Sequence, residues 1–276
     1  MKKKVEKGRW SLLMILGTLL VLVGFGFAIW KTGWDGKTDF KLAVISSNKL
    51  AMISVSPVRD MVNIFEVGGS TPVWVPGGLG WYKSDKIRKL LEEETGFTNY
   101  KEIFFYNFGF IADKVVILDN FEEWSNNKNL ISEMGVFGWI KYTFWQNRVV
   151  VSSENNLLML GEVMMRDFGD DRILVDEARL SIYNTSGETG FANFMSERLE
   201  RAGFLVMEVS NSEEVTDKCA MVYNPALGEN YGLSLLRELF DCPVKTDDNL
   251  GENEIYLYLG DGFAQMLKYS NYVRSF

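Results

Sequence analysis

A hydrophobic run, SLLMILGTLLVLVGFGFAIW, occupies residues 11–30 and contains no charged residue. Twenty helical residues at about 1.5 Å each span roughly 30 Å, the thickness of the hydrocarbon core of a bilayer. A core helix would carry a polar face, and a cleaved signal peptide would end in small residues rather than in Ile29 and Trp30. The pattern therefore predicts an uncleaved transmembrane signal anchor.

Charge on either side of this run predicts its orientation. Residues 1–10 hold five cationic side chains against Glu6, a net charge of +4, and subtracting this from the total of −8 leaves −12 on the remainder. Basic flanks stay in the cytoplasm. We therefore expect a cytoplasmic tail at 1–10, a linker at 31–40, and a location outside the cell membrane for everything that follows.

From residue 41 to about 168, some segments alternate apolar and polar residues as strands do, and others repeat them with the period of a helix. Strands are expected in KLAVISSNKLAMISVSP (two strands around a turn at Ser47–Lys49), MVNIFEV, KVVILDN as a buried strand, and RVVVSSE. One helix is expected from Ser84, its cap, to about Thr95, and another from Phe121. These elements predict a mixed α/β domain.

After a charged linker at 169–177, residues 178–265 form a second unit with clearer periods. Its expected strands are RLSIYN, FLVMEVS, CAMVYN, PVKT and IYLYLG, and its expected helices are Thr189–Ala202 and Tyr231–Phe240. The fold class is therefore α/β (α+β): a transmembrane helix, a mixed α/β domain, and a small ferredoxin-like β-α-β-β-α-β domain.

Composition excludes several functions. An acidic body argues against nucleic acid as a partner, because phosphates require a basic face. The chain contains no histidine, which excludes Ser-His-Asp and Cys-His catalysis and any zinc site built with imidazole.

The turn NTSGETG, residues 184–190, opens the first helix of the second unit and resembles a phosphate-binding loop. It lacks the Lys and Ser/Thr of a P-loop and the third glycine of a dinucleotide fingerprint, and Glu188 is unlike a basic RNA-binding loop. A structural turn, in which Gly190 lets the helix begin close to the sheet, is the preferred interpretation.

Five short stretches of the second unit, in order and spacing, resemble the LytR C-terminal domain family over residues 178–264. They are Tyr183-Asn184-Thr185-Ser186-Gly187, Gly190-Phe191-Ala192, Gly203-Phe204-Leu205-Val206, Met221-Val222-Tyr223 and Leu259-Gly260-Asp261. Phe191 departs from the small or aliphatic residue often found there. The resemblance implies an extracytoplasmic, envelope-associated module without established catalysis.

In that family the module is often attached to a LytR-CpsA-Psr domain, which transfers glycopolymers from a polyprenyl pyrophosphate to the cell wall. VSPVRD, Val55–Asp60, is similar to the Ser-Ile-Pro-Arg-Asp signature of those enzymes, with Val58 inserted. Arg59 and Asp60 are thus candidate phosphate and Mg²⁺ contacts, with a surface ion pair at a strand end as the preferred interpretation. Arg88, Arg148 and Arg166 fit no clustered arginine motif, so the domain is interpreted as degenerate.

Two further stretches of the first domain carry candidate binding residues. In VPGGLGWYKSD, a plain connecting loop is the preferred interpretation, and an anion site formed by Lys83 and a helix N-terminus is the alternative. The dense aromatic segment at residues 104–110 is expected to place alternate members in the core. Phe105, Phe108 and Phe110 are candidates to face a lipid chain, because the transferase family holds its polyprenyl tail in an apolar tunnel, but core packing is the preferred interpretation.

Cys219 begins one strand of the second unit, and Cys242 follows the helix that returns alongside it. Both are expected at the same end of the domain, close enough for a disulfide in an oxidising compartment. The alternative is that Cys219 packs in the core as a small apolar residue.

The sequence thus predicts a membrane-anchored envelope protein that binds or scaffolds cell-wall or lipid-linked glycopolymer components, with envelope proteins as possible partners and no cofactor. A divergent phosphotransferase, which would need Mg²⁺, is the alternative function.

Overall fold

The computed structural model describes residues 34, 36–93, 100–122, 149–152, 160–214 and 216–270, together with Thr18. Within these ranges no helix is both long and apolar enough to cross a membrane. Apart from Thr18, the predicted anchor at residues 11–30 lies outside the described residues, so the anchor stays a prediction.

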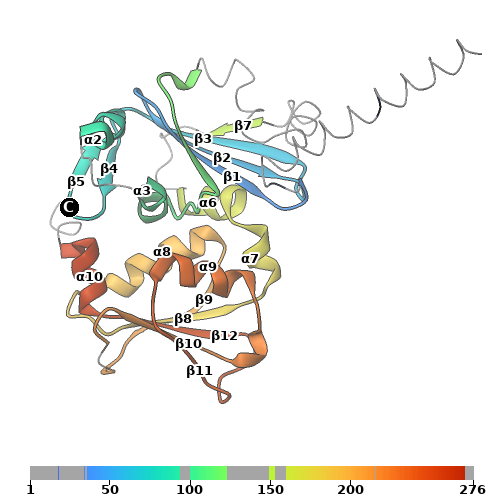
Figure 1. The fold of residues 1–276 in the computed structure, drawn as a ribbon, viewed down its shortest axis with the longest axis vertical. Coiled ribbons are helices and arrows are strands. Elements are labelled where there is room, and N and C mark those ends of the chain that lie inside the picture. The colour runs from blue at the N-terminus through green and yellow to red at the C-terminus, as the bar shows by residue number, and fades with distance from the viewer. Residues whose placement is uncertain are drawn as a thin grey trace, which may run out of the picture.

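The first unit is built on a five-stranded sheet with the strand order β6-β1-β2-β3-β7 (Figure 1). Its strands are β1 (Phe40–Ile45), β2 (Leu50–Ser56), β3 (Met61–Val67), β6 (Lys114–Ile117) and β7 (Val149–Ser152). The first three form an antiparallel meander, and β6 and β7 add in parallel to β1 and β3. The predicted turn between β1 and β2 is confirmed, and the Ser46 hydroxyl donates to the Lys49 carbonyl at 2.8 Å.

Both β1 and β2 are buried along their whole length, because apolar side chains cover the two faces of the sheet. One face packs on α-helical segments and on Phe110, which follows α3, and the other packs on Trp34 and Phe121. β6 corrects a prediction: it was expected as a buried strand, but Ile117 is 45% exposed. Its position at the edge of the sheet explains this exposure.

The segment expected as a connecting loop around VPGGLGWYK is instead a β-hairpin. β4 (Pro72–Val75) pairs with β5 (Gly80–Lys83), and the turn uses positive φ at Gly77 and Gly78. A 3-10 turn, Ser84–Lys86, then leads into α2 (Ile87–Glu93), and α3 spans Tyr100–Phe108. The Ser84 hydroxyl does not cap the helix as expected; it donates to the Gly68 carbonyl, so Ser84 ties the hairpin to the end of β3.

The second unit places two helices on one face of another five-stranded sheet (Figure 1). In chain order its elements are β8 (Arg179–Asn184), α8 (Phe191–Ala202), β9 (Leu205–Asn211), β10 (Cys219–Tyr223), a 3-10 turn (Pro225–Leu227), α9 (Tyr231–Phe240), β11 (Val244–Thr246), β12 (Glu254–Leu259) and α10 (Asp261–Leu267). Both predicted helices are present, with α8 beginning two residues later than expected. The helix α10 was not predicted.

The strand order β11-β10-β12-β8-β9 corrects the expected ferredoxin-like topology. In a split β-α-β unit another strand separates the two strands that a helix joins. Here β8 and β9 are direct parallel neighbours, as are β10 and β11, and β12 lies between the two β-α-β units. The sequence pattern gave the order of elements along the chain but not their order in the sheet.

The expected linker contains the helix α7 (Asp171–Val175), which follows α6 (Leu160–Phe168) and lies between the two units. The units also share a core, because Trp74, Phe105 and Tyr106 from the first pack with α8 and α9 of the second. Gly109 shows how close this contact is: a Cβ there would lie 2.5 Å from the Arg198 carbonyl oxygen. The two units therefore form one packed body.

Of the two alternatives for Cys219, the structure contains the disulfide. Cys219 and Cys242 are bonded, their Cα atoms lie 5.3 Å apart, and both are buried. The bridge ties the start of β10 to the segment that follows α9.

Candidate functional site

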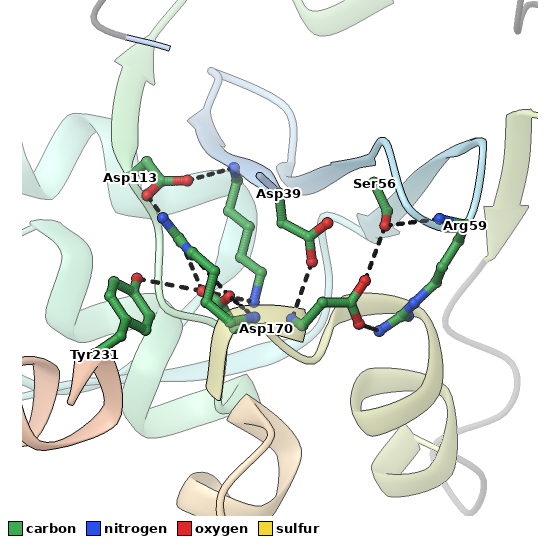
Figure 2. Close-up of polar contacts among 9 residues, drawn as sticks. Asp39, Ser56, Arg59, Asp113, Asp170 and Tyr231 are labelled. Carbon is green, nitrogen blue, oxygen red and sulfur yellow. Dashed lines mark hydrogen bonds and ion pairs between the residues drawn. The ribbon is translucent and has the colours of Figure 1, made fainter. Parts of the chain in front are cut away.

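A polar network joins the two units at the position of α7 (Figure 2). At its centre, the carboxylate of Asp170 caps α7 by accepting from the Arg172 backbone N–H at 3.0 Å. The Arg172 guanidinium donates to both oxygens of Asp170, at 2.9 and 2.7 Å, and the Tyr231 hydroxyl donates to one of them at 3.4 Å. Asp170 thus gathers contacts from α7 and from α9 of the second unit.

From the first unit, Lys41 on β1 reaches the same carboxylate. Its Nζ lies 3.7 Å from Asp170 Oδ2, and both side chains are fully buried. Burial lowers the pKa of Lys41, and the neighbouring carboxylates only partly oppose this. Burial also raises the pKa of Asp170, but Lys41 and Arg172 outweigh it and hold that pKa below its ordinary value. Asp170 is therefore ionised, and its negative charge is the main interaction that favours the charged form of the buried Lys41.

Asp39 and Asp113 complete the buried side of the network. The Asp113 carboxylate accepts from the Lys41 backbone N–H at 2.7 Å, and Asp39 accepts from the Asp171 backbone N–H at 3.1 Å. Burial raises the pKa of Asp39. Within the described part of the chain, Asp39 Oδ1 and Lys41 Nζ are buried without a hydrogen-bond partner. The network therefore carries a large desolvation cost at these two atoms.

Arg59, a predicted phosphate contact, lies at the outer end of this network (Figure 2). Its guanidinium pairs with Asp171 and donates to the Arg166 carbonyl, and Asp171 also accepts from the Ser56 hydroxyl at 3.1 Å. Asp60, the predicted metal contact, has a positive φ of 58° in the turn between β2 and β3. Arg59 therefore holds α7 against this turn.

Lys83, the third predicted contact, does not lie near Arg59 in the fold. It precedes Ser84, which bonds to Gly68 and Thr71 beyond the end of β3, whereas Arg59 precedes the start of β3. The length of β3 separates these two ends by roughly 20 Å at about 3.3 Å per residue. The structure thus places the sequence-predicted contacts at opposite ends of one strand.

The other arginines have carboxylate partners of their own. Arg88 pairs with Glu92 and Asp119, and Arg166 pairs with Asp167 at 2.8 Å; Arg148 lies outside the described residues. Across the described ranges, no group of three His, Cys, Asp or Glu side chains is arranged to hold a metal ion. A pyrophosphate site of converging guanidinium groups is not formed by Arg59, Arg88 and Arg166.

A pocket of about 270 Å³ opens between α3 of the first unit and α9 of the second. Its lining residues are Lys101, Glu102, Phe105, Tyr106, Ile111, Ala112, Asp113, Tyr231, Leu235, Glu238 and Leu239. Asp113 and Tyr231 belong to the polar network as well, so the network forms one wall of the pocket. The remaining wall is mainly apolar, with the carboxylates of Glu102 and Glu238 and the ammonium group of Lys101 around it.

The aromatic segment that holds the candidate lipid-facing residues is divided between two cores. It lies on α3 and the turn after it, and a helix directs neighbouring side chains to different faces. Phe108 and Phe110 are buried in the first unit, where Phe110 lies 6.0 Å from Phe168 between ring centroids, which corrects the alternative that they face a lipid chain. Of the three candidates only Phe105 lines the pocket, and burial raises the pKa of its neighbour Tyr106.

The glycine turn before α8 is held by its own side chains. Asn184 accepts from the Ser186 backbone N–H at 3.1 Å and donates to the Glu188 carbonyl at 3.0 Å, and Gly190 begins the helix with a φ of 80°. The Gly187 N–H donates to Asp261 at 2.7 Å. A carboxylate of the protein thus occupies a donor that a phosphate would need, consistent with the structural interpretation.

Sequence reasoning missed Lys41 and Asp170. A lysine within the apolar stretch KLAVI and an aspartate pair after Gly169 were the available signals. Neither signal identifies its partner, because 129 positions of sequence, from Lys41 to Asp170, separate the two.

Comparison with known proteins gives three results. Two solved structures from Listeria show weak similarity. The Lin1025 protein of Listeria innocua is 11% identical, with 74% of this chain and 99% of that chain covered and a TM-score of 0.24. The putative transcriptional factor Lmo1026 of Listeria monocytogenes is 10% identical, with 75% and 97% covered and a TM-score of 0.17. No curated protein matches the chain. Residues 177–263 match the family described as LytR cell envelope-related transcriptional attenuator, which confirms the resemblance of the second unit to the LytR C-terminal domain.

Proposed function

We propose that this chain is a membrane-anchored, extracytoplasmic protein of the cell envelope that binds or scaffolds a cell-wall or lipid-linked glycopolymer in the pocket between α3 and α9. Two observations carry the proposal: both units contribute walls to this pocket, and the second unit matches a family described as cell envelope-related. In this proposal the first unit is a degenerate LytR-CpsA-Psr-like domain, and the segment VSPVRD at the end of β2 supports that relationship.

Binding is preferred over phosphotransfer because of the arginine contacts. A transferase of this kind needs guanidinium groups that are available to a pyrophosphate. Arg59 and Arg88 are instead paired with Asp171 and Asp119, and Arg166 is paired with Asp167. The pocket itself has three carboxylates and one lysine, a charge balance that favours the sugar part of a glycopolymer over its phosphate groups.

Filling the pocket is expected to abolish this binding. Leu239 is partly exposed and lines the pocket, so Leu239→Trp places a larger side chain in its volume without removing a core residue. We expect the full chain in nanodiscs to lose at least about tenfold in affinity, or about 1.4 kcal/mol, for purified peptidoglycan that carries its glycopolymer. Co-sedimentation over a range of peptidoglycan concentrations measures the affinity.

Val244→Trp, at an exposed position on β11, is the matched control and should bind like wild type. Equal loss in both variants would indicate a general effect of tryptophan, and unchanged binding in Leu239→Trp would place the ligand elsewhere. If wild type does not sediment with peptidoglycan at all, the proposed function is wrong.

The proposed topology makes a separate prediction. Because the cationic residues 1–10 precede the apolar run, protease added to intact cells should digest both described units and spare only the N-terminal tail. Immunoblotting with a tag at residue 276 reads the result. A C-terminal unit that survives in intact cells and is cut only after permeabilisation would show that the predicted orientation is wrong.

A further inference from the structure

Three apolar side chains project into solvent where the turn between β2 and β3 meets α7. Val58 is 75% exposed, Leu174 is 51% exposed and Val175 is 80% exposed. We propose that this apolar tip, defined as Val58, Leu174 and Val175, rests in the headgroup region of the membrane that anchors the chain. The inference rests on the proposed anchor and adds a second, peripheral membrane contact to it.

The tip is one surface because polar contacts hold its two parts together. Arg59, next to Val58, pairs with Asp171 at the start of α7, and Asp171 also accepts from the Ser56 hydroxyl. Asp39, immediately before β1, accepts from the Asp171 backbone N–H at 3.1 Å. The start of β1, the β2–β3 turn and α7 therefore lie at the same end of the molecule, and Figure 2 shows Asp39, Ser56 and Arg59 side by side there.

The length of the chain places this end near the membrane. The predicted span ends at Trp30, and Trp34 is already packed in the first unit, with its ring 5.5 Å from that of Phe40 and only 6% of its surface exposed. Four Cα–Cα steps of 3.8 Å allow at most about 15 Å between these two residues. Phe40 pairs with Val55, two residues before the turn that carries Val58. The anchor therefore keeps the tip close to the bilayer surface.

Both acidic and basic side chains surround the tip: Asp60 lies two residues after Val58, and Asp176 and Glu177 follow Val175, whereas Arg166 and Lys37 supply positive charge. Arg166, beside the Arg59 contact, is 71% exposed at its side chain although it is paired with Asp167, and Lys37 is exposed three residues before β1. Arginine and lysine next to exposed apolar side chains are the combination that binds anionic headgroups while the apolar groups enter the interface.

A fluorescent probe at the tip tests the proposal in the full chain. Val175→Cys is labelled with an environment-sensitive maleimide without reductant, so that the Cys219–Cys242 bridge stays closed. The protein is then reconstituted in vesicles that contain nitroxide-labelled lipids. The matched control is Met266→Cys on α10, which is 45% exposed and lies on the opposite side of the molecule from α7 in Figure 1.

We expect the lipid nitroxide to quench the probe at position 175 at least about threefold more strongly than the probe at position 266. Equal quenching at the two positions overturns the proposal. A probe at 175 that is shielded from aqueous iodide but is not quenched by the lipid also overturns it, and assigns the surface to a second copy of the chain. If the protein is washed from the vesicles by alkaline carbonate, the proposed anchor has failed; if it stays anchored with position 175 in water, only the membrane contact of the tip is wrong.

Discussion

The variant Asp170→Asn is expected to lose about 3–5 kcal/mol of the free energy of unfolding, as other proteins do when one partner of a buried ion pair is removed. Asp170 neutralises Lys41 and Arg172, and the Lys41 side chain has no exposed surface at all. Asparagine keeps the shape of the side chain and still accepts the capping hydrogen bond, so most of the loss comes from the missing charge. Urea unfolding followed by tryptophan fluorescence measures it.

Lys41→Met is the informative comparison. It removes the buried ammonium but leaves Asp170 with Arg172 and with its hydrogen bonds to Tyr231 and the backbone. Burying the Lys41 ammonium is costly, and its ion pair with Asp170, at 3.7 Å, offsets only part of that cost. The free energy of unfolding of Lys41→Met should therefore lie within about 1 kcal/mol of the wild-type value or above it. Equal losses in Asp170→Asn and Lys41→Met would contradict this asymmetry between the two partners.

The dependence of stability on pH gives an independent check. The pKa of Lys41 in the folded chain lies below 10.5, its ordinary value, because of burial. Between these two values the unfolded chain still binds a proton that the folded chain has released, so the free energy of unfolding rises with pH. The free energy of unfolding of wild type should therefore increase relative to that of Lys41→Met as pH rises toward 10. A difference that stays constant with pH would mean that burial does not lower the pKa of Lys41 in the folded chain.

For Asp170 the dependence of stability on pH appears in acid rather than in alkali. Its pKa is lower in the folded chain than in the unfolded chain, because Lys41 and Arg172 stabilise the carboxylate. Its contribution is thus complete above the ordinary value of 3.8 and is lost as pH falls through the folded value. The difference in the free energy of unfolding between wild type and Asp170→Asn should accordingly become smaller in acid.

Local patterns predicted most elements of the fold. A turn between two apolar runs identified β1 and β2, alternation identified β3, and helical periodicity gave α9 at its observed bounds, Tyr231–Phe240. These signals are reliable because burial on one face repeats every two or 3.6 residues. The order of strands in the second sheet was not predictable in this way, since the same succession of elements is compatible with both the split and the adjacent β-α-β arrangement.

The errors in the first unit have a common physical cause. Phe105 and Phe108 were interpreted on a strand-like basis, but they lie on α3, which packs between two units and is therefore apolar on more than one face. An all-round apolar segment has no period that distinguishes strand from helix. The glycine-rich segment before Lys83 was likewise expected as a loop, although its glycines supply the positive φ values of a hairpin turn.

The candidate site was the least predictable part of the protein. Single residues such as Arg59 and Lys83 were recognised by chemistry, but the partner of Arg59 lies 112 positions later, in Asp171. The pocket depends on how α3 and α9 approach each other, and both helices also pack in the shared core. Contacts between distant segments follow from tertiary packing, which one sequence without homologues does not encode in any local pattern. Only the disulfide, which lies within a single β-α-β unit, could be placed from topology.

Removing this disulfide is expected to lower the free energy of unfolding of the second unit by about 3 kcal/mol. Cys219 and Cys242 are 23 positions apart, and chain-entropy reasoning assigns roughly this value to a loop of that length. The double variant Cys219→Ala, Cys242→Ala restores the loop's freedom in the unfolded chain while it keeps small apolar groups at two buried positions. The loss should reach the first unit as well, because Trp74, Phe105 and Tyr106 are buried against the same core as the bridge.

Urea unfolding with and without dithiothreitol measures this effect and contains its own control. Wild type should lose about 3 kcal/mol on reduction, whereas the double variant should be insensitive to the reductant because it has no cysteine left. Thiol titration of the unfolded, unreduced wild-type chain gives the covalent state directly. Two free thiols in that titration, or a wild-type stability that reductant leaves unchanged, would mean that the bridge is absent or does not constrain the unfolded chain.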